Sequence, residues 1–366
     1  MLPHRPDLDP LPDPPVASAR ARWKALLGLA LATALGAGIG FLLGESSVDV
    51  GLEVGPFAAA LVLGIPGAIA VHELGHVIGG QIAGWRFVLL IVGPVMVARD
   101  EGGLEWKLNK SLGLAGGLAL SLPTSRSDLR RESALVVGGG PVASLALGAL
   151  GVALGGAWAV VGLVSLGIGL VTLFPGRTSG FLTDGARLLR LLRGGAPADR
   201  EAALLAVLAQ SLSGVRPRDW DAGLLEVAAA LEDSDPMETS AHALGTTLAL
   251  DAGDADAARR HLARRVALWD ATPPAIRGGL AADAALFEAA VRNDAERARA
   301  WLDRVPPRAA LADPATDALA RAATLRAEGD LEAARAAADE SRATLSNPLA
   351  LGSAEAVRDW LAGMGL

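Results

Sequence analysis

His72-Glu73-Leu74-Gly75-His76, an HExxH sequence, lies inside an apolar stretch that is long enough to cross a membrane. Residues 54–71 before it and residues 77–85 after it carry no charged side chain. Charged and metal-binding side chains at membrane depth cost about 2.5–3.5 kcal/mol each, so they persist where they are paired, coordinated or functional. The stretch therefore predicts a metal site within a membrane-spanning helix. The alternative, two histidines held only by hydrogen bonds, suits a soluble core better than a membrane helix.

The composition indicates a membrane domain joined to a soluble one. The chain has 366 residues, 51% of them hydrophobic, and the apolar runs are concentrated in the first half. The net charge of −7 and the scattered Lys and Arg exclude a nucleic-acid surface. There is no cysteine, which excludes disulfides and thiolate ligands. A metal must therefore be held by carboxylates and by members of the five histidines, which are His4, His72, His76, His242 and His261.

The charges that flank the apolar runs predict the orientation. Residues 1–23 are rich in Pro and Asp and are expected to form a disordered cytoplasmic tail. Residues 25–44 are 20 uncharged residues that follow three basic side chains, so the positive-inside rule places the tail in the cytoplasm. A second span, about Pro56 to Gly80, then returns, and HExxH falls in its cytoplasmic half.

The next two apolar segments are too short to cross as helices. Phe87 to Ala98 is rich in β-branched residues and Ser111 to Thr124 is rich in Gly, so we expect a short, membrane-associated β-hairpin. Residues 133–176 are uncharged and long enough for two spans, with a break near Gly155-Gly156. Residues 24–195 thus form a membrane domain of about four spans. Both ends are expected in the cytoplasm of a multi-pass protein of a bacterial cell membrane.

The spacing of HExxH suits zinc chemistry. Residues i and i+4 share one face of a helix, so His72 and His76 can reach one ion, with Glu73 beside them as a base for water. Catalytic zinc takes three protein ligands and leaves one position for water, so a third ligand must come from elsewhere. Asp184 stands out because Asp184-Gly185 follows a loop and begins a helical segment, although a helix N-cap is an equally good role for it. The carboxylates available in this half are Asp100, Glu101, Glu105, Asp128, Glu132 and Asp184.

Three motifs together resemble the site-2 protease family of intramembrane zinc metalloproteases. They are HELGH at 72–76, Gly140-Pro141-Val142-Ala143-Ser144, and Leu173-Phe174-Pro175 followed by Asp184-Gly185. The last two are similar to the family's Gly-Pro-x-x-Asn and to its Asn-x-x-Pro…Asp-Gly segment. The resemblance covers about residues 25–195.

The resemblance implies roles for individual residues. His72, His76 and Asp184 would ligate Zn2+, and Glu73 would activate water to cut a peptide bond in or near a transmembrane segment of a membrane-protein substrate. Ser144 and Thr172 stand where the family has Asn, at positions that support the substrate strand or the transition state.

Residues 196–366 read as a separate, cytoplasmic α-helical domain. A turn signature recurs at Gly253-Asp254, Asn293-Asp294 and Gly329-Asp330, about 36–40 residues apart. This predicts helix hairpins that weakly resemble tetratricopeptide repeats, with plain antiparallel helices as the alternative, and such a domain suits a protein partner. We expect His242 and His261 to be surface residues. The tryptophans Trp220, Trp269, Trp301 and Trp360 are expected to be core anchors.

The fold class expected is therefore mainly α: a polytopic membrane helix bundle with a short β-hairpin, followed by a soluble repeat-like domain. The leading hypothesis for function is an intramembrane zinc endopeptidase. A second hypothesis, motivated by Ser144 and Thr172, is an inactive membrane scaffold that keeps the zinc site while the helical repeats recruit a partner. A metal transporter or sensor is a third, and only one compact ligand set is visible for it.

Overall fold

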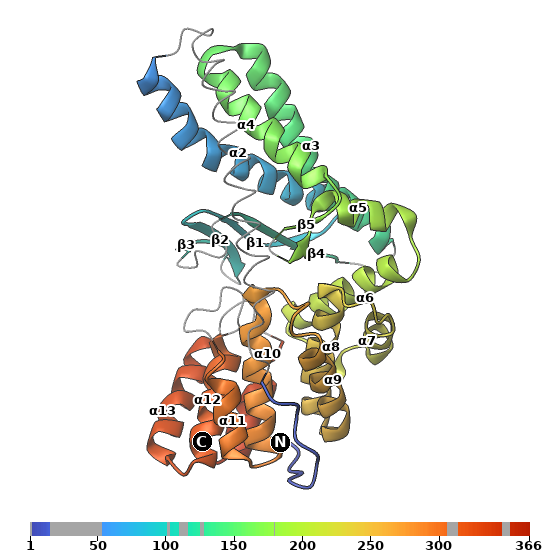
Figure 1. Cartoon of the computed structure of the whole chain (residues 1–366), viewed down its shortest axis with the longest axis vertical. Coiled ribbons are helices and arrows are strands. Elements are labelled where there is room, and N and C mark those ends of the chain that lie inside the picture. The colour runs from blue at the N-terminus through green and yellow to red at the C-terminus, as the bar shows by residue number, and fades with distance from the viewer. Residues whose placement is uncertain are drawn as a thin grey trace.

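The computed structural model describes residues 2–14, 53–100, 103–109, 116–124, 128–178, 180–305, 314–345 and 352–366. It is mainly helical with a small antiparallel sheet, as expected. Figure 1 shows three long helices at one end, the sheet in the middle and a group of shorter helices at the other end. The predicted span at residues 25–44 lies outside the described residues.

Three helices are long and apolar enough to cross a membrane: α2 (Val54–Ile82), α3 (Leu129–Leu154) and α4 (Gly156–Leu173). Most of their side chains are not buried by the rest of the chain. Large apolar side chains such as Leu63, 74% exposed, and Leu170, 61% exposed, face outward. A soluble protein buries such residues, whereas lipid tails solvate them.

The three helices pack through small residues. The side of α3 that is buried carries Ser133, Val137, Gly140, Pro141, Ser144, Gly148 and Gly151. A Cβ added at Gly75 or Gly79 of α2 would overlap the backbone of α3 at Gly139 or Leu135. Close backbone approach through glycine is typical of helix packing in membranes, where burying apolar surface gives no advantage over lipid.

The break predicted near Gly155-Gly156 is confirmed. Gly155 ends α3 and Gly156 begins α4, and both have positive φ values, 74° and 57°. Few other residues adopt this backbone conformation without strain, so the glycine pair turns the chain back on itself.

The extended segment after HExxH is larger than predicted. Instead of a hairpin there is a four-stranded antiparallel sheet in the order β3-β2-β1-β4. Its register pairs Leu89 with Ala98 and Leu90 with Ala119. The prediction was too small because β3 alternates charged and apolar side chains and was not recognised as a strand. The strands are β1 (Arg86–Val92), β2 (Val95–Asp100), β3 (Gly103–Leu108) and β4 (Leu118–Leu122).

The sheet connects the two ends of the molecule. Its buried residues, among them Val88, Ile91 and Leu122, form one apolar cluster with Leu212 of α6 (Ala196–Leu212). The same sheet follows directly from α2 through the turn at Gly84. The sheet therefore joins the helix that carries HExxH to the C-terminal helices.

A short connection leads from α4 to the C-terminal helices. The two-stranded ribbon of β5 (Arg177–Thr178) and β6 (Phe181–Leu182) is followed by α5 (Asp184–Arg193). The later helices are α6, α7 (Ala222–Ala229), α8 (Pro236–Ala252), α9 (Ala255–Ala267), α10 (Pro274–Leu286), α11 (Ala295–Leu302), α12 (Pro314–Ala327), α13 (Leu331–Thr344) and α14 (Ala354–Gly363), with a 3-10 turn η2 (Pro217–Asp219) and a π-helical turn η3 (Phe287–Val291).

The recurring turn signature marks helix hairpins. Asp254, Asp294 and Asp330 each cap the second helix of a pair by accepting a backbone N–H, and the residue before each has positive φ. One residue in the left-handed conformation ends the first helix and the Asp begins the next. The tryptophans Trp220, Trp269, Trp301 and Trp360 are all buried, as expected.

Residues 2–14 are packed against these helices, although they were expected to be disordered. Leu2 and Leu11 are 8% and 1% exposed and belong to the core of the C-terminal helices. Their Pro- and Asp-rich composition predicts disorder, but the leucines and the backbone find partners on α9, η3 and α11. The dark blue segment beside these helices in Figure 1 is this part of the chain.

Candidate metal centre

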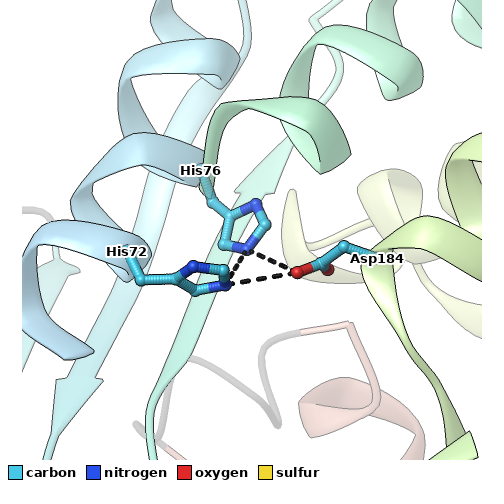
Figure 2. A group of neighbouring side chains, drawn as sticks. All are labelled: His72, His76 and Asp184. Atoms are coloured by element: carbon cyan, nitrogen blue, oxygen red, sulfur yellow. Dashed lines mark hydrogen bonds and ion pairs between the residues drawn. The ribbon is translucent and has the colours of Figure 1, made fainter. Parts of the chain in front are cut away.

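His72 and His76 lie on one face of α2, and Asp184, at the first position of α5, points between them (Figure 2). The Nε2 atoms of the two histidines are 3.2 Å apart. The Asp184 Oδ2 atom is 3.2 Å from His72 Nε2 and 3.6 Å from His76 Nε2. Among the described residues these three form the group that could hold a metal ion. The structure therefore brings together the three residues that the sequence indicated.

Each imidazole is oriented through its other nitrogen. His76 Nδ1 is 2.8 Å from the Val136 carbonyl oxygen, which only accepts, so Nδ1 carries the proton and Nε2 of the neutral ring keeps a lone pair. His72 Nδ1 is 2.9 Å from the Ser144 hydroxyl. Such outer partners fix the tautomer and the ring orientation of metal-binding histidines. Both Nε2 atoms are thus available to one ion.

Glycine makes room for this arrangement. A Cβ at Gly140 would overlap the His76 ring, so the Gly-Pro motif of α3 leaves the space that the imidazole occupies. A Cβ at Gly185 would overlap the backbone of Leu173 at the end of α4. Gly185 therefore allows α5 to start against α4, which places Asp184 next to the histidines.

Asp184 is not the cap of α5. That role belongs to Thr183, whose hydroxyl accepts from the Ala186 N–H at 3.4 Å and donates to the Phe174 carbonyl at 2.8 Å. Thr183 thus holds the connection from α4, and the Asp184 carboxylate is not needed to cap the helix. The N-cap alternative for Asp184 is wrong because the helix begins one residue earlier than that role requires, with Asp184 as its first residue.

The electrostatics of the site favour the ionised carboxylate. Burial by itself would raise the pKa of Asp184, but its hydrogen bonds to His72 and His76 and their charge outweigh this and lower the pKa below its ordinary range. Three electron-pair donors at such short separation repel one another unless a proton or a cation lies between them.

The donor set fits a metal ion. Zinc with nitrogen and oxygen ligands at 2.0–2.2 Å in a tetrahedron requires donor atoms about 3.3 Å apart. The three separations here, 3.2, 3.2 and 3.6 Å, match that edge. Two imidazoles and one carboxylate is also a ligand set of catalytic zinc, which leaves a fourth position for water.

Glu73 lies between the histidines in sequence and faces the sheet. Its carboxylate lies near the backbone of Ala119 in β4. A Cβ at Gly117 would overlap that carboxylate, so the residue before β4 must be small. Sequence reasoning missed Gly117, whose positive φ of 111° is a signal only once the chain path is known.

The other carboxylates considered as ligands have different partners. Glu132 accepts from Trp85 Nε1 at 2.8 Å, and Asp128 caps α3 by accepting from the Arg131 N–H. Glu105 pairs with Lys107 at 2.5 Å. The side chain of Asp100 and residue Glu101 lie outside the described part of the structure.

Ser144 and Thr172 both use their hydroxyls within the helices. Ser144 is fully buried and bonds to His72, while the Thr172 hydroxyl donates to the Gly169 carbonyl of its own helix at 3.3 Å. Support of a substrate by these two residues stays a prediction.

The remaining histidines do not belong to this centre. His4 is exposed in the N-terminal segment. His242 of α8 and His261 of α9 were expected on the surface, but they are half-buried and face each other, with their Nδ1 atoms 2.9 Å apart. Gly245 makes this possible, because a Cβ there would meet the His261 ring at 2.7 Å.

Comparison of the chain with protein-family models, curated proteins and solved structures found no match.

Proposed function

We propose that this chain is an intramembrane zinc metalloendopeptidase of the site-2 protease type. The observation that carries the proposal is the convergence of His72, His76 and Asp184 at the foot of three helices that expose apolar side chains. A ligand set within a membrane is costly to maintain without a use. The resemblance of HELGH, Gly-Pro and Asp-Gly to the family supports the same class of activity.

His72, His76 and Asp184 would hold the zinc ion. When bound, zinc acts as a Lewis acid and lowers the pKa of water toward ~7. Glu73 would serve as the base that takes a proton from this water and would pass it to the leaving amine. Its carboxylate lies against Gly117 and near Ala119, at the start of β4. Helices α2, α3 and α4 keep bulk water away from the reacting groups.

The edge of the sheet supplies a place for the substrate. In the described part of the sheet, β4 pairs with β1 and ends the strand order, and Glu73 lies beside the start of β4, at Gly117 and Ala119. An extended peptide that adds to this edge would pass beside Glu73. A transmembrane substrate must unwind to expose a peptide bond, and pairing with β4 replaces the hydrogen bonds that it loses.

The contact between the N-terminal segment and the C-terminal helices supports the proposed topology. Residues 2–14 and the helices that they contact must lie on the same side of the membrane, which requires an even number of crossings between them. The described residues carry three candidate spans. The span that the sequence predicts at residues 25–44, outside the described residues, would make the number of crossings even. We propose a multi-pass protein with both ends in the cytoplasm.

The test is cleavage of candidate transmembrane substrates by the purified chain in lipid. Wild type loaded with zinc should cut, and Glu73→Gln should bind zinc but not cut. Glu53→Gln is the matched control, because Glu53 begins the same helix and makes no capping hydrogen bond there. Equal cleavage by wild type and Glu73→Gln would sink the mechanism.

An inactive scaffold is the second candidate function. It is favoured by the hydroxyls of Ser144 and Thr172, which are engaged within the helices. It predicts one zinc per chain, no cleavage of any membrane substrate by wild type, and full rescue of a deletion phenotype by Glu73→Gln.

A further inference from the structure

Residues 2–14, with the sequence LPHRPDLDPLPDP, lie along α9, η3 and α11, a surface called here the tail-binding surface. The contacts are made mainly to the backbone of the segment. Arg259 Nε donates to the Asp9 carbonyl at 2.7 Å, and Arg292 Nε donates to the Leu8 carbonyl at 2.8 Å. Arg297 donates to the Leu11 carbonyl. Three arginines from two helix hairpins thus hold one short segment of chain, which turns between Arg5 and Leu8 through a hydrogen bond from the Leu8 N–H to the Arg5 carbonyl.

The surface also accepts hydrogen bonds from the backbone N–H groups of the segment. Leu11 N–H donates to Glu288 Oε1 at 2.8 Å, and Arg5 N–H donates to the Val291 carbonyl at 2.7 Å. Both acceptors belong to the π-helical turn η3, where the regular helical hydrogen-bond pattern is interrupted. Such π-helical turns are frequent at functional sites because they release backbone groups for other partners. Glu288 is fully buried when the segment is in place, and its carboxylate also pairs with Arg292, so loss of the segment removes one of its hydrogen-bond partners.

The side chains of the segment give the contact its selectivity. Leu11 is buried in the core of the C-terminal helices and Leu8 packs against it. Asp13 pairs with Arg297 at 2.9 Å, and Asp9 lies 3.6 Å from Arg259. Five prolines fix the backbone φ angle at five positions of the segment, so it loses less chain entropy on binding than a segment without proline.

We propose that the tail-binding surface is a recognition site for an acidic peptide rich in proline and leucine, that residues 2–14 are its resident ligand, and that this contact is reversible. A segment of the same chemistry on a partner protein therefore reaches this surface by displacing residues 2–14. This inference is independent of the proposed protease activity and does not require zinc.

The experiment measures binding of a labelled peptide of residues 2–14 to the full-length chain in detergent. Two altered chains are compared with wild type: one lacks residues 2–14, and one carries Leu2→Ser with Leu11→Ser. Linked segments compete at effective concentrations in the millimolar range, so both altered chains should bind the peptide at least about tenfold more tightly than wild type. Equal binding to wild type and to folded altered chains would overturn the proposal.

Arg259→Ala tests the recognition itself. In a chain without residues 2–14, it should weaken peptide binding about three- to tenfold, because one backbone contact is lost. Arg260→Ala is the matched control on the same helix: it removes the same charge from an exposed neighbour and should leave binding unchanged.

Amide hydrogen exchange in the unaltered chain covers the case in which the altered chains do not fold. A displaceable segment opens without global unfolding, so the amides of Arg5 and Leu11 should exchange at least about tenfold faster than those in the middle of α10. Protection equal to that of α10 would show a permanent part of the core and would overturn the proposal.

Discussion

Two pairs of histidines lie in the two halves of this molecule, and they differ first in whether a carboxylate accompanies them. His72 and His76 approach within 3.2 Å, and His242 and His261 within 2.9 Å. The first pair has a carboxylate, that of Asp184, against both rings. The second pair is joined only by a hydrogen bond between its rings. Close approach of two imidazoles therefore does not by itself define a metal site. A third donor atom and lone pairs that point toward one position are also required.

The two pairs also differ in their outer partners. At the candidate metal centre the Val136 carbonyl and the Ser144 hydroxyl hold the Nδ1 atoms, which leaves both Nε2 atoms for an ion. In the C-terminal helices the Nδ1 atoms of His242 and His261 face each other, and His242 Nε2 is buried without a hydrogen-bond partner. The first arrangement orients both rings toward one shared ion, and the second holds two neutral rings.

The largest expected effect is loss of metal on removal of the carboxylate. Asp184→Ala should lower zinc affinity by more than about a hundredfold, beyond the loss caused by removing an outer partner, because it leaves two imidazoles as the only ligands. Zinc content after dialysis against a weak chelator measures this. His242→Ala should leave zinc content at the wild-type level. Loss of zinc in His242→Ala alone would reverse the assignment of the two pairs.

The next largest effect is expected from Gly185→Ala, because the added methyl group overlaps the backbone of Leu173 and not a flexible side chain. Overpacking of this kind costs about 3 kcal/mol, and here it also moves Asp184 away from the histidines. The expected result is a lower thermal transition together with reduced zinc content.

The control for this change is Gly167→Ala. Gly167 lies in α4 with open space where a Cβ would be. The zinc content should stay at the wild-type level. The transition temperature should stay the same or rise slightly, since Ala favours a helix over Gly. Zinc binding that is unaffected in Gly185→Ala would contradict the role given to this glycine.

The parts of the site that could be predicted from sequence are those set by local geometry. The i, i+4 spacing places His72 and His76 on one face of any helix, and Asp184-Gly185 after a loop indicates a carboxylate at a helix start. The break at Gly155-Gly156 follows in the same way from two adjacent glycines in an uncharged run.

The rest depends on contacts between residues far apart in the chain. The Val136 carbonyl has no side-chain signature, so its contact with His76 cannot be read from sequence. The composition of residues 2–14 by itself indicates disorder. The residues that hold this segment in place, such as Glu288 and Arg292, are nearly three hundred positions away, so its packing cannot be read from the local sequence. His242 and His261 meet only because α8 and α9 form a hairpin, which no local pattern of histidines reveals.

A smaller effect is expected from the outer partner of His72. Ser144→Ala removes the hydroxyl at Nδ1 and should lower zinc affinity about 10- to 100-fold without removing a ligand. Ser165→Ala is a matched control, since Ser165 is equally buried and bonds to the Ser144 backbone carbonyl, not to the ring. If both variants lose zinc equally, the effect comes from helix packing and not from ring orientation.

The smallest effect concerns the second pair and its dependence on pH. Burial and the neighbouring His261 lower the pKa of His242 from 6.5 to about 4. The folded state therefore binds fewer protons than the unfolded state between these values, so the stabilisation present above pH 6.5 is lost as the pH falls toward 4. Because His242 is partly exposed, solvent screening limits the loss at pH 5.5 to about 1 kcal/mol or less.

The measurement is the difference in thermal transition between pH 7.5 and pH 5.5. His242→Asn should show a smaller decrease than wild type, because the group that takes up the proton on unfolding is gone. His4→Asn removes an exposed histidine and should keep the wild-type decrease. If His242→Asn and wild type lose the same stability, the His242–His261 contact does not hold neutral rings. The contrast with the metal-binding pair would then rest on Asp184 alone.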